Sequence, residues 1–221
     1  MLRGTTSYGT GIDSYETVLT PLERVRAALL VGMDRLDYVA AHLLVRICAA
    51  RLAQVPPWSL VIDQRCPGCG ATDHGKPFVR DHPGLSVSLS HTRGTVAAAA
   101  GWSVVGVDVE TTAGFIYDRR LAERVLAPEE VAAVDAAPHP ALAFLRRWVR
   151  KEALVKAGHG SLLGPPTAGS GAADAGRRVR EWTAGDSGAV AAGVSEQPLT
   201  LLRAQDRPYG QPIPDDRPGG P

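Results

Sequence analysis

The sequence has 221 residues and contains no asparagine, few aromatic residues (5%) and very little lysine. Only three of its 24 basic side chains are lysines, namely Lys76, Lys151 and Lys156. The bias towards arginine, alanine, glycine and proline is typical of coding from a G+C-rich genome, so it does not by itself indicate a function. The lysines are more informative, because an ammonium is a compact charge with a tunable proton, whereas arginine stays protonated in proteins.

An excess of charge of one sign is also absent. The chain has 24 basic and 23 acidic side chains, which gives a formal net charge of +1 at pH 7. Proteins that coat nucleic acid, or bind membranes through a polybasic segment, carry a clear positive excess. The charge balance therefore predicts that neither nucleic acid nor a membrane is a partner.

Long apolar runs and a cysteine framework are missing as well. The most apolar segment, residues 96–107, is shorter than the roughly 20 residues of a membrane helix and contains glycine and serine. The first twenty residues are polar and lack the apolar region of a signal peptide. Three cysteines, an odd number, do not indicate a disulfide framework. These features predict a soluble, cytoplasmic protein.

Apolar periodicity, cap residues and glycines predict a chain of mixed helices and short strands. Thr20 and Pro21 are of the types preferred at the N-cap and first position of a helix. The elements do not alternate as repeated βαβ units, which favours an α+β fold over a parallel α/β sheet. Helices are expected over residues 21–30, 37–54, 121–126, 128–136 and 140–157, and strands over 59–62, 87–90, 95–100, 104–109, 179–182, 188–194 and 199–203.

The segment GVDVE at 106–110 carries the first candidate site. Side chains alternate between the two faces of a strand, so Asp108 and Glu110 project together while the valines face the core. Neighbouring carboxylates repel each other unless a cation lies between them, and Mg²⁺ prefers oxygen ligands of this kind. The alternative is the solvated face of an ordinary half-buried strand.

A predicted helix places Phe144, Trp148, Glu152 and Lys156 in one row at four-residue spacing. Because the row begins with aromatic residues, we expect Glu152 at the edge of the core, where an unpaired carboxylate is costly. A metal ion or the phosphates of a substrate would relieve that cost. The alternative is a surface Glu–Lys pair that contributes about 0.2–0.5 kcal/mol.

Two shorter motifs combine groups suited to phosphate. Ser88 and Ser90 share one face of a predicted strand, and His91 begins the turn that follows. The motif HGKP at 74–77 forms a turn whose glycine permits close approach to a ligand and whose lysine supplies positive charge. A hydrogen-bonded turn histidine is the alternative for His91.

The order of these motifs is more specific than any one of them. HGKP at 74–77 is followed by SLSH at 88–91, GVDVE at 106–110 and WVRKEALVK at 148–156. This order resembles the Sfp-like 4′-phosphopantetheinyl transferase superfamily, the holo-carrier-protein synthases. The resemblance extends over residues 35–200, most of the chain.

The resemblance implies an α+β fold of two pseudo-symmetric halves with antiparallel sheets. The halves would be residues 1–105 and 106–204, followed by a disordered tail at 205–221, and residues 164–176 would form a linker or loop of small residues. The implied reaction transfers the 4′-phosphopantetheine group of coenzyme A to a serine of a carrier protein and releases adenosine 3′,5′-bisphosphate. Mg²⁺, or Mn²⁺, is the implied cofactor. The carrier is an acyl or peptidyl carrier protein of fatty-acid, polyketide or nonribosomal peptide biosynthesis, and the enzyme is expected to be a monomer.

Residue by residue, the resemblance assigns the metal to Asp108, Glu110 and Glu152. Glu152 would also help to deprotonate the carrier serine, and Lys156 would neutralise or protonate the departing phosphate. Arg35 and Arg46 are the candidates for the 3′-phosphate of coenzyme A. The other contacts to coenzyme A would come from Gly75, Lys76, Pro77, Ser90, His91 and Lys156.

A carrier-docking segment is implied after the DxE strand. Phe115, Ile116 and Tyr117 form an apolar trio there, and Arg120 lies close by in the sequence. Such a surface would suit an acidic, partly apolar carrier helix. The alternative is a loop that packs against the second half.

The motif CPGC at 66–69 is half of a zinc-ribbon pattern. His74 and His82 would complete four ligands, although this spacing matches no common zinc site. Similar loops precede HGKP in relatives, so a tight turn is favoured over zinc, and Cys48 is expected in the core. Two other functions stay open, a metal-dependent phosphohydrolase and a zinc-ribbon interaction module without catalysis.

Overall fold

The computed structural model describes residues 16–160, 176–184 and 188–202. The linker expected at 164–176 lies outside these ranges except for its last residue, and the expected tail lies outside them entirely. The helices are η2 (Glu16–Val18), α2 (Pro21–Leu29), α3 (Gly32–Ala53), η3 (Pro57–Ser59), α4 (Arg119–Val125), α5 (Pro128–Asp135) and α6 (Pro140–Lys156). The strands are β1 (Ile62–Arg65), β2 (Lys76–Val79), β3 (Ser86–Thr92), β4 (Thr95–Gly101), β5 (Val105–Thr111), β6 (Arg178–Ala184) and β7 (Ala189–Ser195).

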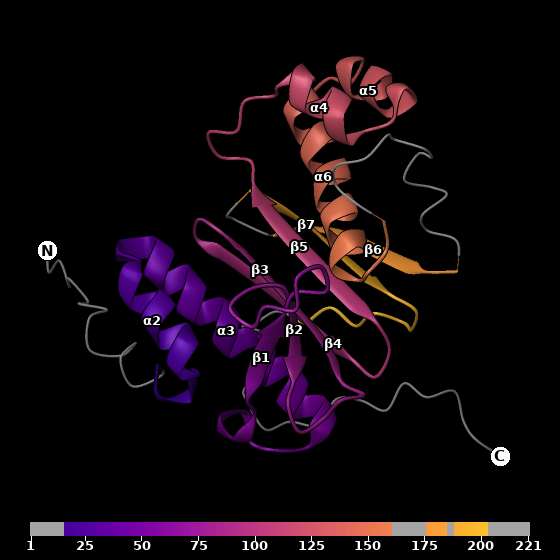
Figure 1. The fold of residues 1–221 in the computed structure, drawn as a ribbon. Coiled ribbons are helices and arrows are strands. Elements are labelled where there is room, and N and C mark those ends of the chain that lie inside the picture. Colours follow the sequence, from indigo (N-terminus) through magenta and orange to yellow (C-terminus); the bar gives the residue numbers. More distant parts are fainter. Residues whose placement is uncertain (1–15, 161–175, 185–187, 203–221) are drawn as a thin grey trace, which may run out of the picture.

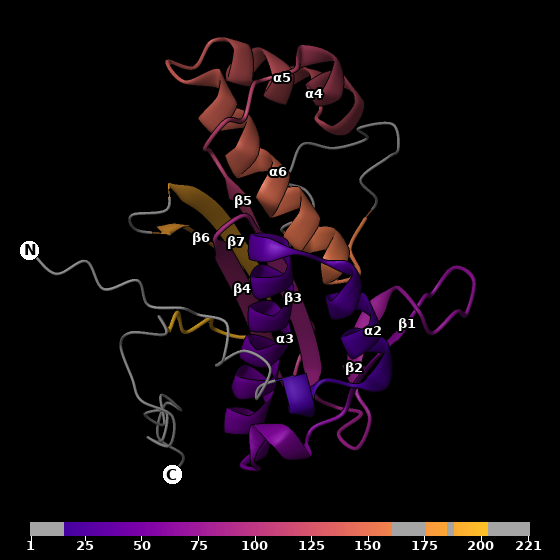
Figure 2. The ribbon, with the colours of Figure 1, turned by 90° about the vertical axis from the view of Figure 1, so that its left-hand side faces the viewer.

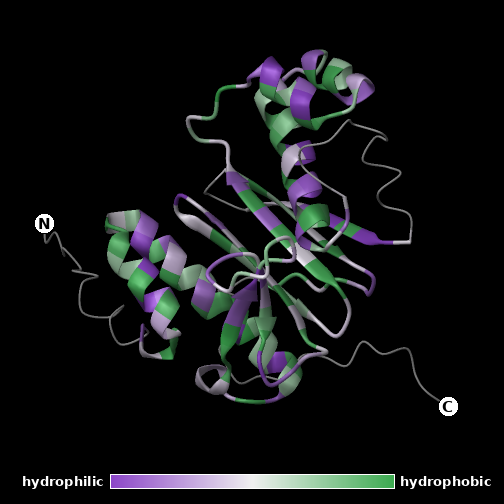
Figure 3. Ribbon diagram, viewed as in Figure 1, coloured by the Kyte–Doolittle hydropathy of each residue, from purple (hydrophilic) through white to green (hydrophobic). Residues whose placement is uncertain are grey.

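In the first half, α3 packs against an antiparallel sheet of order β1-β2-β3-β4, and α2 lies beside α3 (Figures 1 and 2). Helix α2 begins at Pro21 as predicted. The Thr20 hydroxyl accepts a hydrogen bond from the Glu23 N–H (3.3 Å), and the Glu23 carboxylate accepts one from the Thr20 N–H (2.7 Å). Apolar and hydrophilic residues alternate along α2 in Figure 3; its buried residues are Glu23 and Ala27, whereas Leu22, Val25 and Leu29 are exposed.

In the second half, α6 packs across an antiparallel sheet of order β5-β7-β6. Helices α4 and α5 lie together at one end of α6 (Figure 1). The core between helix and sheet is apolar because α6 presents residues at helical spacing to the alternate residues of β7. It includes Phe144, Leu145, Val149, Ala153, Leu154, Val190, Ala192 and Val194.

Two predicted strands are wrong in position. Residues 57–59 form a short 3₁₀ helix, so the first strand begins at Ile62 instead of residue 59. Residues 199–202 form no strand, and residue 203 lies outside the described part of the chain. Instead, the Leu199 side chain covers the sheet at Gly193, and the Leu199 carbonyl accepts a hydrogen bond from the Arg180 guanidinium (3.1 Å).

The two halves meet where β3 lies beside β5. Every second side chain of β3 carries a hydroxyl, and three of these accept hydrogen bonds from backbone N–H groups of β5. The offset between partners is 19 residues in each pair, so the two strands run in the same direction. The pairs are Ser86–Val105 (3.3 Å), Ser88–Val107 (3.1 Å) and Thr92–Thr111 (3.3 Å).

The predicted α+β class with antiparallel sheets is confirmed. Each sheet carries one long helix, α3 in the first half and α6 in the second. Within the described residues, no helix combines the length and apolarity required to cross a membrane.

Candidate active site

Asp108 lies in β5 with only 3% of its surface exposed. Its Oδ1 atom accepts two hydrogen bonds, one from the Ser90 hydroxyl (2.7 Å) and one from the Lys156 ammonium (2.7 Å). Its Oδ2 atom is buried and has no hydrogen-bond partner among the described residues. A buried carboxylate oxygen without a partner is costly, so this atom marks a position where a cation would be stabilised.

The close approach of α6 to β5 depends on Gly106. A Cβ atom at this position would lie 2.0 Å from the Ala153 carbonyl oxygen and 2.7 Å from the Ala157 nitrogen. The absence of a side chain thus lets the end of α6 touch the strand, which brings Lys156 within reach of Asp108. The glycine that precedes the DxE pair was the sequence signal for this contact.

Glu110 from β5 and Glu152 from α6 are the other two carboxylates near Lys156. Burial, and then the charge of Asp108, raises the pKa of Glu110 and the pKa of Glu152. Lys156 lowers both pKa values, but by less than burial and Asp108 raise them. The site therefore holds more carboxylate charge than its own cation neutralises.

These carboxylates fit a hard divalent cation such as Mg²⁺, which takes oxygen ligands. Asp108 Oδ2 has no partner, and burial, followed by the charge of Asp108, raises the pKa values of Glu110 and Glu152; a bound cation would offset each of these costs. The three carboxylates are not among the sets of described residues whose ligand atoms all lie within 4.8 Å of one another. The fit of these residues to Mg²⁺ is therefore inferred from their carboxylate oxygens and from the unpartnered, buried Oδ2 of Asp108.

Ser90 and His91 have separate surroundings. The Ser90 hydroxyl is buried and donates to Asp108, so it positions a carboxylate instead of pointing to solvent. The His91 ring is exposed beyond it, and its edge packs on Tyr38 with 6.2 Å between ring centroids. The expectation that the serine hydroxyl is available to a phosphate is not supported, whereas His91 is accessible to a ligand.

The HGKP motif forms the junction between the loop and β2. Gly75 has a φ of +103°, and a Cβ there would lie 2.4 Å from the Arg65 carbonyl oxygen and from the Cys66 Cα. Its close approach is therefore to the end of β1, which corrects the expectation of a close approach to a ligand. Lys76 is exposed and pairs with Arg65 in the strand register.

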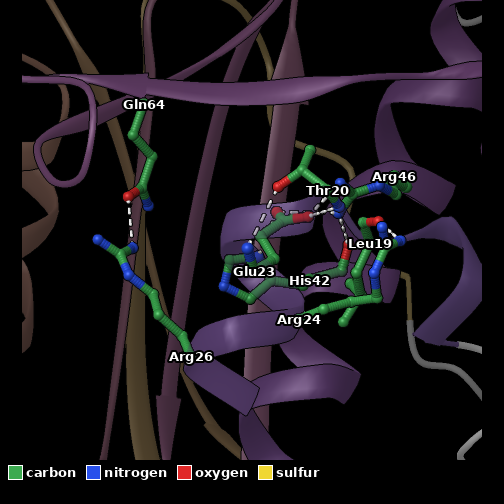
Figure 4. Close-up of polar contacts among 8 residues, drawn as sticks. All are labelled: Leu19, Thr20, Glu23, Arg24, Arg26, His42, Arg46 and Gln64. Atoms are coloured by element: carbon green, nitrogen blue, oxygen red, sulfur yellow. Dashed lines mark hydrogen bonds and ion pairs between the residues drawn. The ribbon is translucent and has the colours of Figure 1, made fainter. Parts of the chain in front are cut away.

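Arg46 is buried in α3, with 1% of its surface exposed, and both terminal nitrogens of its guanidinium are hydrogen-bonded within the first half (Figure 4). It binds the Glu23 carboxylate (2.6 Å) and donates to the His42 carbonyl (2.9 Å). Burial would raise the pKa of Glu23, but hydrogen bonds from His42 and Arg46 outweigh it and lower this pKa to about 2. The expected contact of Arg46 with coenzyme A is not supported, because the side chain serves an interior ion pair. Arg35 lies nearer the surface, where it pairs with Glu16 (2.7 Å).

The apolar trio after β5 divides into inward and outward residues. Phe115 stacks on Phe144 with ring centroids 5.7 Å apart. Tyr117 also packs on Phe144, and its hydroxyl donates to Asp135 (2.8 Å). Ile116 is 85% exposed. The first and third residues thus anchor the segment to α5 and α6, and the middle one is left on the surface.

The remaining lysine of the active-site helix has a structural contact. The Lys151 ammonium donates to the carbonyl oxygen of Val125, the last residue of α4. Carbonyls at the end of a helix lack partners within the helix, so this contact holds α4 against α6. Burial lowers the pKa of Lys151.

A separate cleft of about 490 Å³ opens in the first half between α2 and β1. Its lining includes Arg26, Trp58, Asp63 and Arg80, but none of the three carboxylates of the candidate site. The cleft is therefore a feature of the first half alone.

Residues 104–184 match the model of a family described as the 4′-phosphopantetheinyl transferase superfamily. A comparison with curated proteins found no match for the chain. The matched range includes β5 and α6, the two elements that supply Asp108, Glu110, Glu152 and Lys156. The predicted resemblance to the 4′-phosphopantetheinyl transferase superfamily is confirmed for residues 104–184, the part of the chain that carries the GVDVE and WVRKEALVK motifs. Phosphopantetheinyl transfer is the chemistry of this family, which uses coenzyme A, acts on carrier proteins and typically employs a divalent metal.

Proposed function

We propose that the protein is an Sfp-type holo-carrier-protein synthase, which transfers 4′-phosphopantetheine from coenzyme A to a carrier serine with Mg²⁺ and releases adenosine 3′,5′-bisphosphate. The observation that carries the proposal is the environment of Asp108. Its Oδ1 atom accepts hydrogen bonds from Lys156 and Ser90, and its buried Oδ2 atom has no donor among the described residues. This arrangement suits a metal placed between Asp108, Glu110 and Glu152.

The proposed reaction exchanges one phosphorus–oxygen bond for another. When bound, the metal would act as a Lewis acid on the pyrophosphate oxygens. Glu152, whose pKa is raised, would accept the proton of the carrier serine as the serine oxygen bonds to phosphorus. Lys156 would neutralise the negative charge that develops on the bisphosphate as its bond to phosphorus breaks.

We place the coenzyme A contacts on exposed groups of the first half. Lys76 is exposed at the start of β2 and His91 near the end of β3, and both are able to meet phosphate oxygens. Gly75 and Pro77 would shape the backbone beside Lys76. Arg35 is retained as a candidate for the 3′-phosphate, on condition that it releases Glu16.

The proposed division into halves 1–105 and 106–204 is supported by the sheets. The boundary falls at the start of β5, after the last strand of the first sheet. Ser90 from the first half contacts Asp108 from the second, so one chain supplies both sides of the site. This sharing supports a monomer, which size-exclusion chromatography with light scattering would test. We place the enzyme in the cytoplasm, on the basis of its proposed substrates.

Carrier docking is proposed at Ile116 and Arg120. Ile116 is 85% exposed, and Arg120 is exposed at the start of α4. A groove of about 620 Å³ runs between α4 and α5; apolar residues such as Leu126 and Val131 line it, and its Arg119 pairs with Glu123 and Asp135 of the same groove. An acidic, partly apolar helix would complement the exposed Ile116 and Arg120. We propose carriers of fatty-acid, polyketide or nonribosomal peptide synthesis as partners.

The test is a transfer assay with a panel of apo acyl and peptidyl carrier proteins, coenzyme A and Mg²⁺. The expected result is a mass gain of one phosphopantetheine on the carrier serine, which is lost with EDTA and absent from a carrier whose serine is replaced by alanine. Replacing Mg²⁺ by Mn²⁺ measures the metal preference. Hydrolysis of coenzyme A without carrier modification across the panel would overturn the proposal in favour of a phosphohydrolase.

A further inference from the structure

Cys66, Cys69 and His74 come together in the loop that joins β1 to β2. Their sulfur and imidazole nitrogen atoms all lie within 4.8 Å of one another, and Cys69 Sγ lies 3.5 Å from His74 Nε2. Zinc bonds of about 2.3 Å to sulfur and about 2.05 Å to nitrogen, at a tetrahedral angle, place these two atoms about 3.6 Å apart. The observed separation matches that of two ligands of one zinc ion.

We propose that Cys66, Cys69 and His74 bind a Zn²⁺ ion, with a water molecule as the fourth ligand. Thiolate and imidazole ligands favour zinc, whereas Mg²⁺ prefers oxygen, so this site and the carboxylate site select different metals. His82 is not part of this set of ligand atoms. The expected four-residue set is therefore reduced to three protein ligands, and the expectation that the CPGC loop is only a tight turn is replaced.

Asp73 orients the histidine for this role. The His74 Nδ1 atom lies 2.8 Å from the Asp73 carboxylate, so the proton of the neutral ring is held at Nδ1. The lone pair of Nε2 then faces Cys69. A carboxylate that accepts a hydrogen bond from the other ring nitrogen is a common feature of zinc-bound histidines.

Backbone hydrogen bonds and a glycine with positive φ fix the turn that follows Cys66. The Cys66 N–H donates to the Ala71 carbonyl (2.8 Å), and the Gly70 N–H donates to the Cys66 carbonyl (2.9 Å). Gly70 has a φ of +75°, which lets the chain turn back after Cys69. The backbone N–H groups of Cys69 and Gly68 lower the pKa of the Cys66 thiol to about 7.

The metal would close the loop at the point where it meets the HGKP motif. Strand β1 ends at Arg65, directly before the first cysteine, and β2 begins at Lys76, two residues after the histidine. A bound ion would therefore tie the ends of the two strands together and fix the backbone that carries Lys76. The proposed role is to hold this loop in place, because none of the three ligands belongs to the proposed catalytic set.

The test is the metal content of the purified, reduced chain after growth with added zinc and dialysis against metal-free buffer. We expect one zinc per chain by mass spectrometry in the wild type. The ion should be lost in Cys69→Ser and His74→Ala, and retained in Cys48→Ser, which changes the cysteine of α3 outside the cluster. Asp73→Asn should weaken zinc binding about 10- to 100-fold.

Two further measurements separate this inference from the proposed transfer. Asp108→Ala should keep its zinc, because the carboxylate site is distinct, and loss of zinc in this variant would overturn the assignment. Titration of the metal-free wild type with Co²⁺ should produce thiolate-to-cobalt charge-transfer bands. A wild type that holds no zinc, gives no such bands and protects neither thiol from alkylation when zinc is added would refute the site, whatever the transfer assay shows.

Discussion

Gly106 of β5 and Ala153 of α6 are in direct backbone contact, since a Cβ on the glycine would stand 2.0 Å from the alanine carbonyl oxygen. The atoms in contact are backbone atoms, which cannot move aside as the end of a flexible side chain can. The separation of strand and helix, and with it the position of Lys156 relative to Asp108, is therefore set by the absence of one methyl group.

Gly106→Ala is expected to push α6 away from β5. Overpacking of this kind costs about 1–3 kcal/mol of unfolding free energy, and the displaced Lys156 should reduce carrier modification as well. Urea unfolding followed by circular dichroism measures the first effect. Gly84→Ala is the control, because the nearest atom to a Cβ there is 3.9 Å away and stability should be almost unchanged. Equal stability of the two variants would contradict the contact.

Glu152→Gln is expected to lower carrier modification about 100-fold or more and to stabilise the metal-free chain at neutral pH. Burial and Asp108 raise the pKa of Glu152 above its ordinary value of 4.5. The wild type should thus lose stability as the pH rises from 4.5 through the raised pKa, because folding opposes ionisation. Thermal unfolding in EDTA between about pH 4 and pH 8 measures this loss. If Glu152→Gln is no more stable than the wild type at about pH 8, ionised Glu152 does not destabilise the folded chain.

Lys156→Arg is expected to reduce transfer about 10- to 100-fold although the positive charge is kept. A guanidinium is planar and larger than an ammonium, so it does not reproduce the 2.7 Å contact with Asp108 in the same space. Steady-state kinetics with a carrier and coenzyme A measure the loss. The converse exchange at an exposed position of the same helix, Arg146→Lys, should leave the rate unchanged. A wild-type rate in Lys156→Arg would mean that charge alone is sufficient.

Glu23→Ala is expected to destabilise the first half by about 3–5 kcal/mol, because it leaves the buried Arg46 without its carboxylate. Asp63→Ala removes the more exposed pair with Arg80 (2.8 Å) and should cost less than about 1 kcal/mol. Since the folded-state pKa of Glu23 is about 2, the wild type should lose this contribution as the pH falls from 4.5 to about 2. Denaturant unfolding at neutral and acid pH tests both statements, and equal losses in the two variants would count against the buried pair.

Ile116→Glu is expected to raise the KM for the carrier at least about tenfold and to leave the KM for coenzyme A unchanged. A carboxylate at this exposed position would repel an acidic carrier helix. Val25→Glu places the same charge on another exposed apolar residue, on α2, and should have little effect. If both substitutions alter the carrier KM equally, the docking surface lies elsewhere.

The sequence was sufficient for features that depend on neighbours along the chain. The start of α2 was predicted correctly because Thr20, Pro21 and Glu23 form its cap among themselves. The row on α6 was also predictable, because helical spacing alone aligns Glu152 with Lys156. Local patterns of this kind do not need knowledge of the tertiary fold.

Partners distant in the sequence could not be predicted from it. The Ser90 hydroxyl looked available for phosphate because its contact with Asp108 exists only after two strands meet. Arg46 looked available because its partner Glu23 lies on a different helix. The cysteine cluster is a related case, since its spacing is unusual and only the folded loop brings His74 to Cys69.

The seam between β3 and β5 also determines how the two halves are aligned. A shift of two residues along β3 would bring another hydroxyl opposite two of the three β5 N–H groups that these hydroxyls bind, because Ser86, Ser88, Ser90 and Thr92 recur at every second position. Such a shift would separate Ser90 from Asp108. Ser88 or Thr92 would then take its place, so the repeated hydroxyls hold the halves together without distinguishing one alignment from the next.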